Sequence, residues 1–329
     1  MGMYTLITQK LLQTGEHLDI AVVNPLDDKY QNLVRPVISH KSANDQWHLD
    51  QVFANRIKLL QTRFYLGLIN DSTVSNIMVS ENNRAGIVSH VYTVPENRKK
   101  GIARLVMNEV IEDFKSRSGR FLTLSTGYDT HPYYLYHSFG FRSVLPKSGH
   151  MKFIMEKQDE VAWFKSSSAR VVKADWGHWP ALNVLCAQVT GSPIRNIALG
   201  HLGPRMFEGA YMSLMKNLQQ NQNYQAYLLI NDWDAVVGYG TLIPDIRWGN
   251  QTDLLDFFVH PAYSSYIPCL VQAFSLPPER KIQCYVVSNN SLAKKLLRKL
   301  EFQNEAKLKK QLFSKNQSID IEIFTRFMQ

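Results

Sequence analysis

Cysteine is scarce in this chain, and long apolar runs are lacking. The 329 residues contain three cysteines, at 186, 269 and 284, without C-x-x-C spacing and with no histidine at zinc-site spacing. This excludes a disulfide framework and a zinc knuckle, and no metal site is predicted. No run approaches the roughly 18 apolar residues of a transmembrane helix, and the polar N-terminal segment does not resemble a signal peptide. We therefore expect a cytoplasmic protein without a membrane partner.

Positive charge is in modest excess. The chain has 37 Lys and Arg against 28 Asp and Glu, a net charge of +9, and the excess is spread over both halves. A diffuse positive balance suits an anionic ligand and equally suits an ordinary solvated surface. The C-terminal region is locally basic but carries no interleaved aromatic residues, so nucleic acid is not expected as a partner.

The sequence contains an internal repeat. Three pairs of similar segments occur in the same order: 65–71 with 227–232, 91–95 with 257–261, and 134–141 with 295–302. A chain of 329 residues also suits two domains of about 150 residues each. We predict two copies of one fold, at residues 1–165 and 166–329, with the seam in the polar stretch at 165–168.

Hydrophobic patterning along the first copy predicts a mixed order of strands and helices. We expect strands at 18–23, 63–69, 75–79, 85–94, 120–125, 141–145 and 151–155, and helices at 30–40, 46–60, 102–116 and 132–138. The helix at 102–116 is amphipathic and follows the strand at 85–94 after a glycine-containing turn.

The informative segment lies in that turn. It contains neither a P-loop nor a G-x-G-x-x-G dinucleotide motif. Gly101 and the small Ala103 open the helix, where unpaired N–H groups and the helix dipole attract phosphate. Positive charge is added by Arg98, Lys99 and Lys100. A solvated basic turn that caps an amphipathic helix is an equally good interpretation of this segment alone.

The segment resembles the acetyl-CoA site of the GNAT superfamily (Gcn5-related N-acetyltransferases), whose pattern is Arg/Gln-x-x-Gly-x-Gly/Ala after the fourth strand. Arg98, Gly101 and Ala103 occupy its three fixed positions. Downstream, D-x-x-P-x-x-L-Y-x-x-x-G-F, from Asp129, is similar to the family's N-x-x-A-x-x-L-Y-x-x-x-G-F. Asp129 and Pro132 depart from that pattern, but Asp129 can cap the helix and proline fits a first helical turn.

The resemblance implies an α/β (α+β) fold class: two tandem GNAT folds, each a mixed, mostly antiparallel sheet of six to seven strands, splayed between strands four and five and flanked by helices. It also implies acetyl-CoA as co-substrate, lying in the splay and attacked directly by an acceptor amine. Tyr136 matches the family's general acid. The residues that the resemblance assigns to acetyl-CoA are Val91, Thr93, Arg98, Lys99, Lys100, Gly101, Ile102, Ala103 and Asp129.

The general base stays open. Family enzymes that carry it on the fourth strand use positions corresponding to Ile87 or Ser89, and neither side chain is basic. Strand alternation places Ser89 with Val91 on one face and His90 on the other, so His90 reaches the cleft only if a bulge re-aims it. A water positioned by Ser89, or an acid from the loop at 27–28 or Asp129, are the alternatives.

The second copy lacks the phosphate-binding features. Ile267 stands where the first copy has Gly101, and Leu297 stands where it has Tyr136. We predict a degenerate domain that walls the acceptor cleft, holds a homodimer or recognises the acceptor. The preferred function is an N-acetyltransferase acting on a primary amine of a small molecule or peptide. The alternative is a non-catalytic acyl-CoA-binding sensor or scaffold protein.

Overall fold

The computed structural model describes residues 4–24, 28–57, 59–221, 223–314 and 317–327. The chain separates into two compact units. The first comprises Met1–Glu160 and Asp175–Val184, and the second comprises Val161–Ala174 and Leu185–Gln329. Residues 165–168, where the sequence predicts the seam, lie in the short stretch that opens the second unit.

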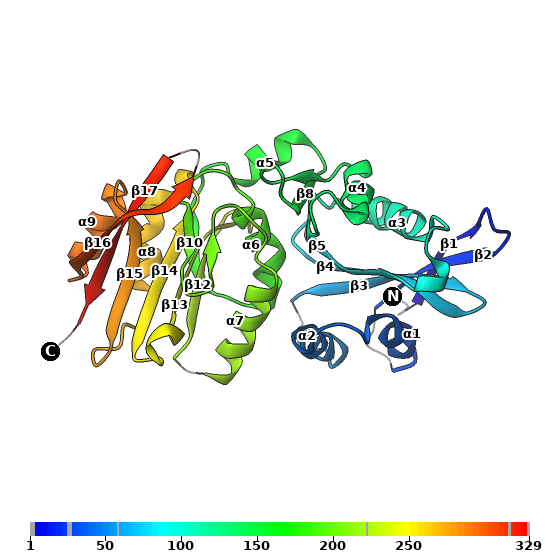
Figure 1. The fold of residues 1–329 in the computed structure, drawn as a ribbon, viewed down its shortest axis with the longest axis horizontal. Coiled ribbons are helices and arrows are strands. Elements are labelled where there is room, and N and C mark those ends of the chain that lie inside the picture. Colours follow the sequence, from blue (N-terminus) through cyan, green and yellow to red (C-terminus); the bar gives the residue numbers. More distant parts are fainter. Residues whose placement is uncertain (1–3, 25–27, 58, 222, 315–316, 328–329) are drawn as a thin grey trace. The chain divides into compact units, whose positions relative to one another are not determined.

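The first unit is built on an eight-stranded sheet with the order β1-β2-β3-β4-β5-β6-β8-β7 (Figure 1). Neighbouring strands are antiparallel, except that β5 and β6 are parallel. The strands are β1 (Tyr4–Leu11), β2 (His17–Val23), β3 (Gln61–Ile69), β4 (Ser72–Asn82), β5 (Ala85–Thr93), β6 (Phe121–Ser125), β7 (Arg142–Ser143) and β8 (His150–Ile154). The helices up to the end of the sheet are α1 (Asp28–Ile38), α2 (Ala43–Phe53), η1 (Pro95–Asn97), α3 (Ile102–Ser116) and α4 (His131–Ser138), and α5 (Lys157–Trp163) follows.

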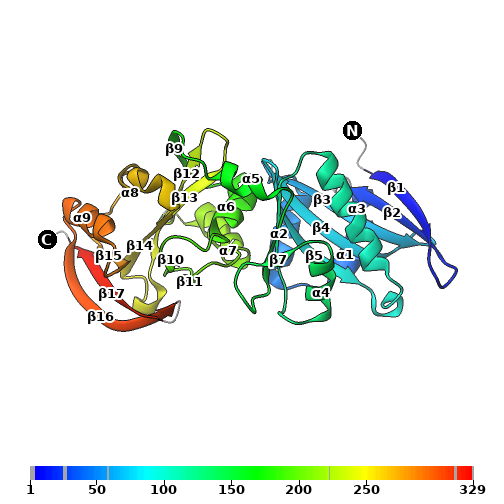
Figure 2. The same cartoon turned by 90° about the horizontal axis from the view of Figure 1, so that it is seen from above.

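Helices cover both faces of this sheet. α3 and α4 lie on one face, and α1 and α2 lie on the other (Figures 1 and 2). α3 begins and ends where the sequence predicts, because its apolar residues recur every four positions along one face. Ile102, Val106 and Val110 are buried there in one hydrophobic cluster with strand residues such as Leu18 and Ile77.

One prediction for the first unit is wrong, and one strand was missed. The helix predicted at 46–60 is wrong beyond Phe53, where α2 ends, and Asn55 adopts a left-handed conformation with φ of 53°. β1, which pairs with β2, was not predicted at all. Its side chains are half-exposed or exposed throughout, so the strand shows no apolar alternation that a sequence pattern could reveal.

The second unit has a seven-stranded sheet with the order β16-β17-β15-β14-β13-β12-β9, in which only β14 and β15 are parallel. The strands are β9 (Ala169–Lys173), β12 (Gln225–Asn231), β13 (Val236–Pro244), β14 (Thr252–Val259), β15 (Lys281–Val287), β16 (Gln303–Ser314) and β17 (Gln317–Arg326). The other elements of this unit are β10 (Ile194–Asn196), β11 (His201–Leu202), α7 (Gly209–Gln220), η3 (Ile246–Trp248), η4 (Pro261–Tyr266), α8 (Ile267–Gln272) and α9 (Ser291–Lys299). η2 (Trp176–His178) and most of α6 (Trp179–Cys186) lie in the segment Asp175–Val184 of the first unit.

The two sheets share one topology. Read from β2 to β7, the first sheet has the same strand order and the same strand directions as the second sheet read from β9 to β16. In both, a parallel pair occupies the same place, and helices flank the sheet (Figure 1). The predicted fold class is therefore confirmed: two mixed, mostly antiparallel sheets flanked by helices. β1 is an addition at the edge of the first sheet.

Candidate functional site

The parallel strands β5 and β6 of the first unit diverge. Their pairing extends only from Ala85 opposite Phe121 to Ile87 opposite Thr123, whereas β5 continues to Thr93. The side chains of β5 change accordingly, from buried over residues 85–88 to half-buried over residues 89–93. One edge of β5 therefore keeps main-chain N–H and C=O groups that β6 does not use, as a bound extended ligand requires.

A β-bulge lies in this unpaired part of β5. Asn76 and Met78 of β4 are two residues apart. Their partners on β5, Tyr92 and Ser89, are three residues apart. The extra residue is His90, whose φ of 50° is in the left-handed region. A bulge of this kind turns the strand and re-aims the side chain at the extra position.

Buried polar side chains of β4 stabilise the bulge. Asn76 is fully buried, and its Nδ2 donates a hydrogen bond of 2.9 Å to the carbonyl oxygen of His90. Ser75 Oγ donates to the carbonyl oxygen of Tyr92 at 3.1 Å and forms a 3.0 Å hydrogen bond with Thr93 Oγ1. These bonds satisfy backbone groups that regular pairing would otherwise satisfy.

The bulge overturns the strict alternation expected along this strand. Val88 and Val91 both pack against the hydrophobic cluster that contains α3, although they are three residues apart. Ser89 is therefore not on the face of Val91, as regular alternation required. Tyr92 lies on the opposite side, where its ring is 4.2 Å from the ring of His40.

The turn after β5 leads into the N-terminus of α3. Gly101 is the N-cap residue, with φ of 79°, and a Cβ added there would meet no atom within 4 Å. Since the position is open, glycine is required by the backbone conformation and not by lack of space. The first N–H groups of α3, including those of Ile102 and Ala103, have no acceptor within the helix, so this end of α3 can receive an anion.

The three cations predicted beside this turn have different surroundings. Arg98 Nε donates to the carbonyl oxygen of Thr93 at 2.9 Å, and its guanidinium lies 5.5 Å from the centre of the Tyr92 ring. Lys100 Nζ forms an ion pair of 2.8 Å with Glu16, in the β1–β2 hairpin. Lys99 is exposed, with φ of 64°. Arg98 thus braces the turn, and Lys100 links it to the hairpin.

The second motif contains α4 and the turn after it, and one prediction there is wrong. Thr130, not Asp129, caps the helix, because the Thr130 side chain accepts a hydrogen bond of 3.4 Å from the backbone N–H of Tyr133. Asp129 precedes the cap with φ of 60°, and its carboxylate accepts a hydrogen bond from the hydroxyl of Tyr134.

Tyr136, the predicted general acid, is 6% exposed. Its ring packs edge-on against Phe141, with 6.0 Å between ring centres, and belongs to the same hydrophobic cluster as α3. The ring is therefore held rigidly. Among the alternative proton acceptors, Asp27 lies outside the described residues, and nothing is described of the Asp28 side chain.

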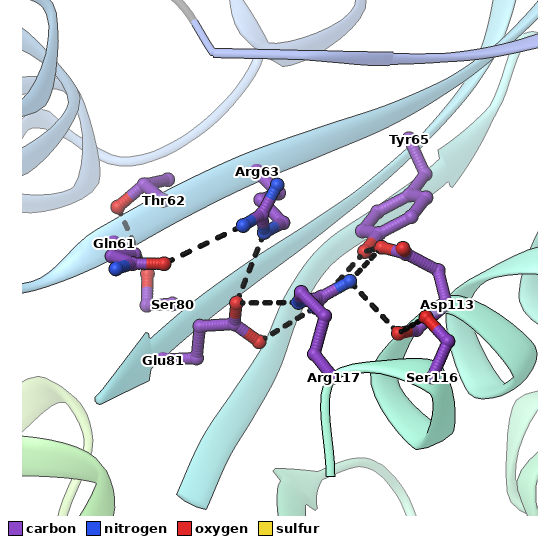
Figure 3. Close-up of polar contacts among 9 residues, drawn as sticks. All are labelled: Gln61, Thr62, Arg63, Tyr65, Ser80, Glu81, Asp113, Ser116 and Arg117. Atoms are coloured by element: carbon purple, nitrogen blue, oxygen red, sulfur yellow. Dashed lines mark hydrogen bonds and ion pairs between the residues drawn. The ribbon is translucent and has the colours of Figure 1, made fainter. Parts of the chain in front are cut away.

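Sequence reasoning missed a polar cluster at the opposite end of α3 (Figure 3). Glu81 of β4 accepts hydrogen bonds from Arg63 Nε at 2.9 Å and from Arg117 Nη2 at 2.8 Å, and Arg117 also pairs with Asp113. The hydroxyl of Tyr65 donates to Asp113, and burial raises the pKa of Tyr65. Tyrosine, arginine and carboxylates spread over three elements form no local motif, so no sequence signal identified this cluster.

A pocket of about 180 Å³ lies beside this cluster, lined in part by Glu81, Arg84 and Arg117. Arg117 and Glu81 already form an ion pair with each other, so the cluster fixes the C-terminal end of α3 to the sheet. Within the described part of the chain, no group of three or more His, Cys, Asp or Glu side chains is placed to hold a metal ion. None of the described helices has the length and apolarity needed to span a membrane.

Residues 30–154 match the family model described as "Acetyltransferase (GNAT) domain". This part of the first unit, which contains the splay, the bulge and the glycine turn, is therefore an acetyltransferase domain of the GNAT family. The resemblance seen in the sequence is confirmed at this level. No curated protein matches the chain.

Solved structures with similarity to this chain include several acetyltransferases. An acetyltransferase of the GNAT family from Streptococcus pneumoniae is 14% identical, with 49% of this chain and 100% of that chain covered and a TM-score of 0.40. The acetyltransferase yncA from Salmonella typhimurium, solved with acetyl-CoA, is 15% identical over 50% of this chain and 95% of that chain, with a TM-score of 0.40. The spermidine/spermine N-acetyltransferase SpeG from Vibrio cholerae is 13% identical over 48% of this chain and 94% of that chain, with a TM-score of 0.35. Scores at this level add nothing to the assignment, which rests on the family model.

Proposed function

We propose that this protein is an N-acetyltransferase, which transfers the acetyl group of acetyl-CoA to a primary amine of a small molecule or peptide within a ternary complex. Residues 1–165 would form the catalytic domain, and residues 166–329 a degenerate copy that supports it. The proposal is carried by one observation: β5 diverges from β6 and is followed directly by a left-handed glycine at the N-terminus of α3.

In this proposal, the backbone at Val91 and Thr93 pairs with the extended pantetheine arm along the free edge of β5. The pyrophosphate was expected to bind the N–H groups from Arg98 to Ala103, but the N–H of Arg98 already donates to the carbonyl oxygen of Pro95 at 3.2 Å. The binding groups are therefore those from Lys99 to Ala103, where the dipole of α3 favours negative charge. Asp129 stands near the start of α4, at the family position assigned to cofactor binding. The three cysteines are unpaired, and two of them are buried, which suits a protein that works in the reducing cytoplasm.

The chemistry has two proton transfers. The amine nitrogen attacks the thioester carbonyl, whose oxygen is polarised by an N–H group of β5. As the C–N bond forms, the C–S bond breaks and its electron pair goes to sulfur. Tyr136 then supplies a proton to the thiolate, and a base takes the proton that the amine loses. The rigid packing of the Tyr136 ring would fix the position of its hydroxyl for this step.

Isothermal titration of acetyl-CoA into the full chain and into its Gly101→Glu variant tests the binding part. We expect one site per chain, lost in the variant, because a side chain at φ of 79° is strained and a carboxylate there repels phosphate. Gly249→Glu is the matched control, since Gly249 of the second unit is also left-handed, with φ of 58° and open space around it. It should bind acetyl-CoA like the unchanged protein.

Other outcomes separate the alternatives. Two sites per chain would show that the second copy also binds the co-substrate. No binding, or unchanged binding by Gly101→Glu, would contradict the proposal. Binding without turnover on a panel of aliphatic polyamines, amino acid amides and peptides would favour the sensor or scaffold function instead.

A further inference from the structure

The general base is the group that the family resemblance leaves unassigned, and the bulge in β5 bears directly on it. At the extra position stands His90, with a left-handed backbone and a carbonyl oxygen held by Asn76 Nδ2 at 2.9 Å. The amide of Asn76 comes from a fully buried side chain, so the bulge is a fixed part of the sheet.

The neighbouring residues show which side His90 occupies. Val88 and Val91 face the hydrophobic cluster with α3, and Tyr92 faces His40, between α1 and α2. Among the described residues, the charged and titratable groups that act on His90 lie on this second side: His40 and Lys41 between α1 and α2, and Asp45 and His48 of α2. His90 therefore faces the side of β5 that α1 and α2 cover, away from the α3 core.

The surroundings of the imidazole keep it in the neutral form. The side chain is half-buried, and within the described part of the chain the ring nitrogens form no hydrogen bond with another protein group. Burial is the main cause that lowers the pKa of His90 to about 4, and the like charges of Lys41 and His40 add to it, against Asp45. At neutral pH the ring is therefore uncharged, with one nitrogen lone pair available.

We propose that His90 is the proton acceptor of the acetyl transfer, a catalytic residue that takes the proton of the acceptor amine as its nitrogen attacks the thioester. The inference rests on the proposed function. The bonds balance as follows: the amine N–H proton goes to the imidazole, the C–N bond forms, the C–S bond breaks, and the thiolate takes a proton from Tyr136. The imidazolium then returns its proton to solvent, and the phenolate regains one.

His90→Gly is the informative variant. Glycine adopts φ of 50° without strain, so the bulge is kept, and the missing ring leaves space for free imidazole. We expect kcat to fall about 10²- to 10³-fold, with the acetyl-CoA dissociation constant within about twofold of the unchanged protein. Added imidazole should restore part of the rate, and the restoration should increase from about pH 6 to 8 as imidazole becomes neutral.

Controls separate catalysis from structure. Ser89→Ala removes the neighbouring hydroxyl and should keep most of the activity, whereas a loss there as large as in His90→Gly would assign the role to a water on Ser89. His90→Asn tolerates a left-handed backbone and tests the result should the glycine variant fold poorly. His90→Asn should lose activity as His90→Gly does. Added imidazole should not restore it, because the asparagine side chain leaves too little space for the ring.

The outcomes distinguish this inference from the proposed function. If the unchanged protein acetylates no amine of the panel, the proposed function fails and takes this inference with it. If the unchanged protein is active and His90→Gly is equally active, or loses activity that imidazole does not restore, only the role of His90 is overturned. Rescue that follows the neutral form of imidazole supports it.

Discussion

Strands β5 and β14 occupy equivalent places in the two sheets, yet they differ by one residue. β14 pairs with β13 without any shift, from Val259 opposite Gly238 to Asp253 opposite Pro244, whereas β5 contains the bulge. Each strand starts at its parallel contact and is followed by a proline. Ala85 is ten positions before Pro95 (95 − 85), and Thr252 is nine before Pro261 (261 − 252). The additional residue in the first unit is the one at the bulge.

The additional residue changes which side chains the strand carries at this position. In the first unit, Ser89 and His90 occupy the place that Asp256 alone occupies in the second. Asp256 is 3% exposed, and its carboxylate accepts a 3.0 Å hydrogen bond from the backbone N–H of Ala198, in the segment between β10 and β11. The second unit thus covers this position with its own chain. A shared topology does not imply a shared site, because access depends on one residue and one loop.

The turns after these strands differ as well. The first unit uses a left-handed glycine to start α3, whereas the second continues through η4 into α8, with Pro268 in the first turn. A proline lacks the N–H group that an anion would bind. The comparison therefore supports the proposal that only the first unit binds acetyl-CoA in the manner of the family.

The largest effect is expected at Tyr136 of α4. Its counterpart in α9 of the second unit is Leu297, and both side chains are buried. We expect Tyr136→Phe to lower kcat about 10³-fold while acetyl-CoA binding is kept, because the ring still packs but the proton donor is gone. Steady-state kinetics with calorimetric binding measures this. Tyr133→Phe, which removes the 3.0 Å hydrogen bond to Ser143, is the control and should stay active. Equal activity of Tyr136→Phe would remove this residue from the mechanism.

The next-largest effect is expected in the polar cluster that holds the C-terminal end of α3 in the first unit. Arg117→Met should destabilise the first unit by about 3 kcal/mol, because it leaves the partly buried Asp113 without a cation and removes one of the two arginines that neutralise Glu81. Hydrogen exchange in denaturant, resolved by segment, should report the loss in β3, β4 and α3. Arg170→Met is the control, because its ion pair with Asp234 is exposed, and it should cost less than about 1 kcal/mol. Similar losses in both variants would contradict a structural role of the cluster.

A smaller effect is expected at Asp256. Burial raises the pKa of its carboxyl to about 6, against an ordinary 3.8. The folded state therefore binds this proton more tightly than the unfolded state, so the second unit loses stability as the pH rises from about 4 to 6, and the loss is complete above that. Asp256→Asn should increase stability by about 2 kcal/mol at pH 7.5 and hardly at all at pH 4, as measured by calorimetry. A gain that is independent of pH would contradict this explanation.

The smallest effect concerns Gln225, which secures the segment after α8. Its side chain donates to the carbonyl oxygen of Ser275 at 2.8 Å and accepts from the N–H of Ser275 at 2.9 Å. Gln225→Ala should cost about 1 kcal/mol, because neutral and exposed hydrogen bonds are replaced by water. Denaturant unfolding measures it. A loss equal to that of Arg117→Met would remove the contrast between a charged and a neutral anchor.

Much of the fold could be predicted because its signals are local. The periodicity of Ile102, Val106 and Val110 defines α3, and the glycine at 101 marks its start. The end of α2 depends on the left-handed conformation of Asn55, and β1 depends on its pairing with β2. Neither feature produces a periodic pattern in the sequence. The role of Thr130 as cap was missed because Asp129, one residue earlier, is an equally good capping residue.

The candidate site was predicted in part for the same reason. The residues of the turn are contiguous in sequence, but the direction of His90 depends on pairing with β4, which a strand pattern does not contain. One signal was available: the distance from the strand start to the following proline is one residue longer in the first copy than in the second. Comparing the copies by length as well as by similarity would have located the bulge.

The bulge also has a consequence for how such a site can arise. An insertion of one codon into a regular strand would move every later side chain to the wrong face, but a bulge absorbs the extra residue. Beyond it, Tyr92 keeps the face of its counterpart Phe258, and before it, Val88 keeps the face of Leu255. One additional residue is therefore enough to separate a strand that presents a histidine at this position from one that buries an aspartate, with the core on both sides unchanged.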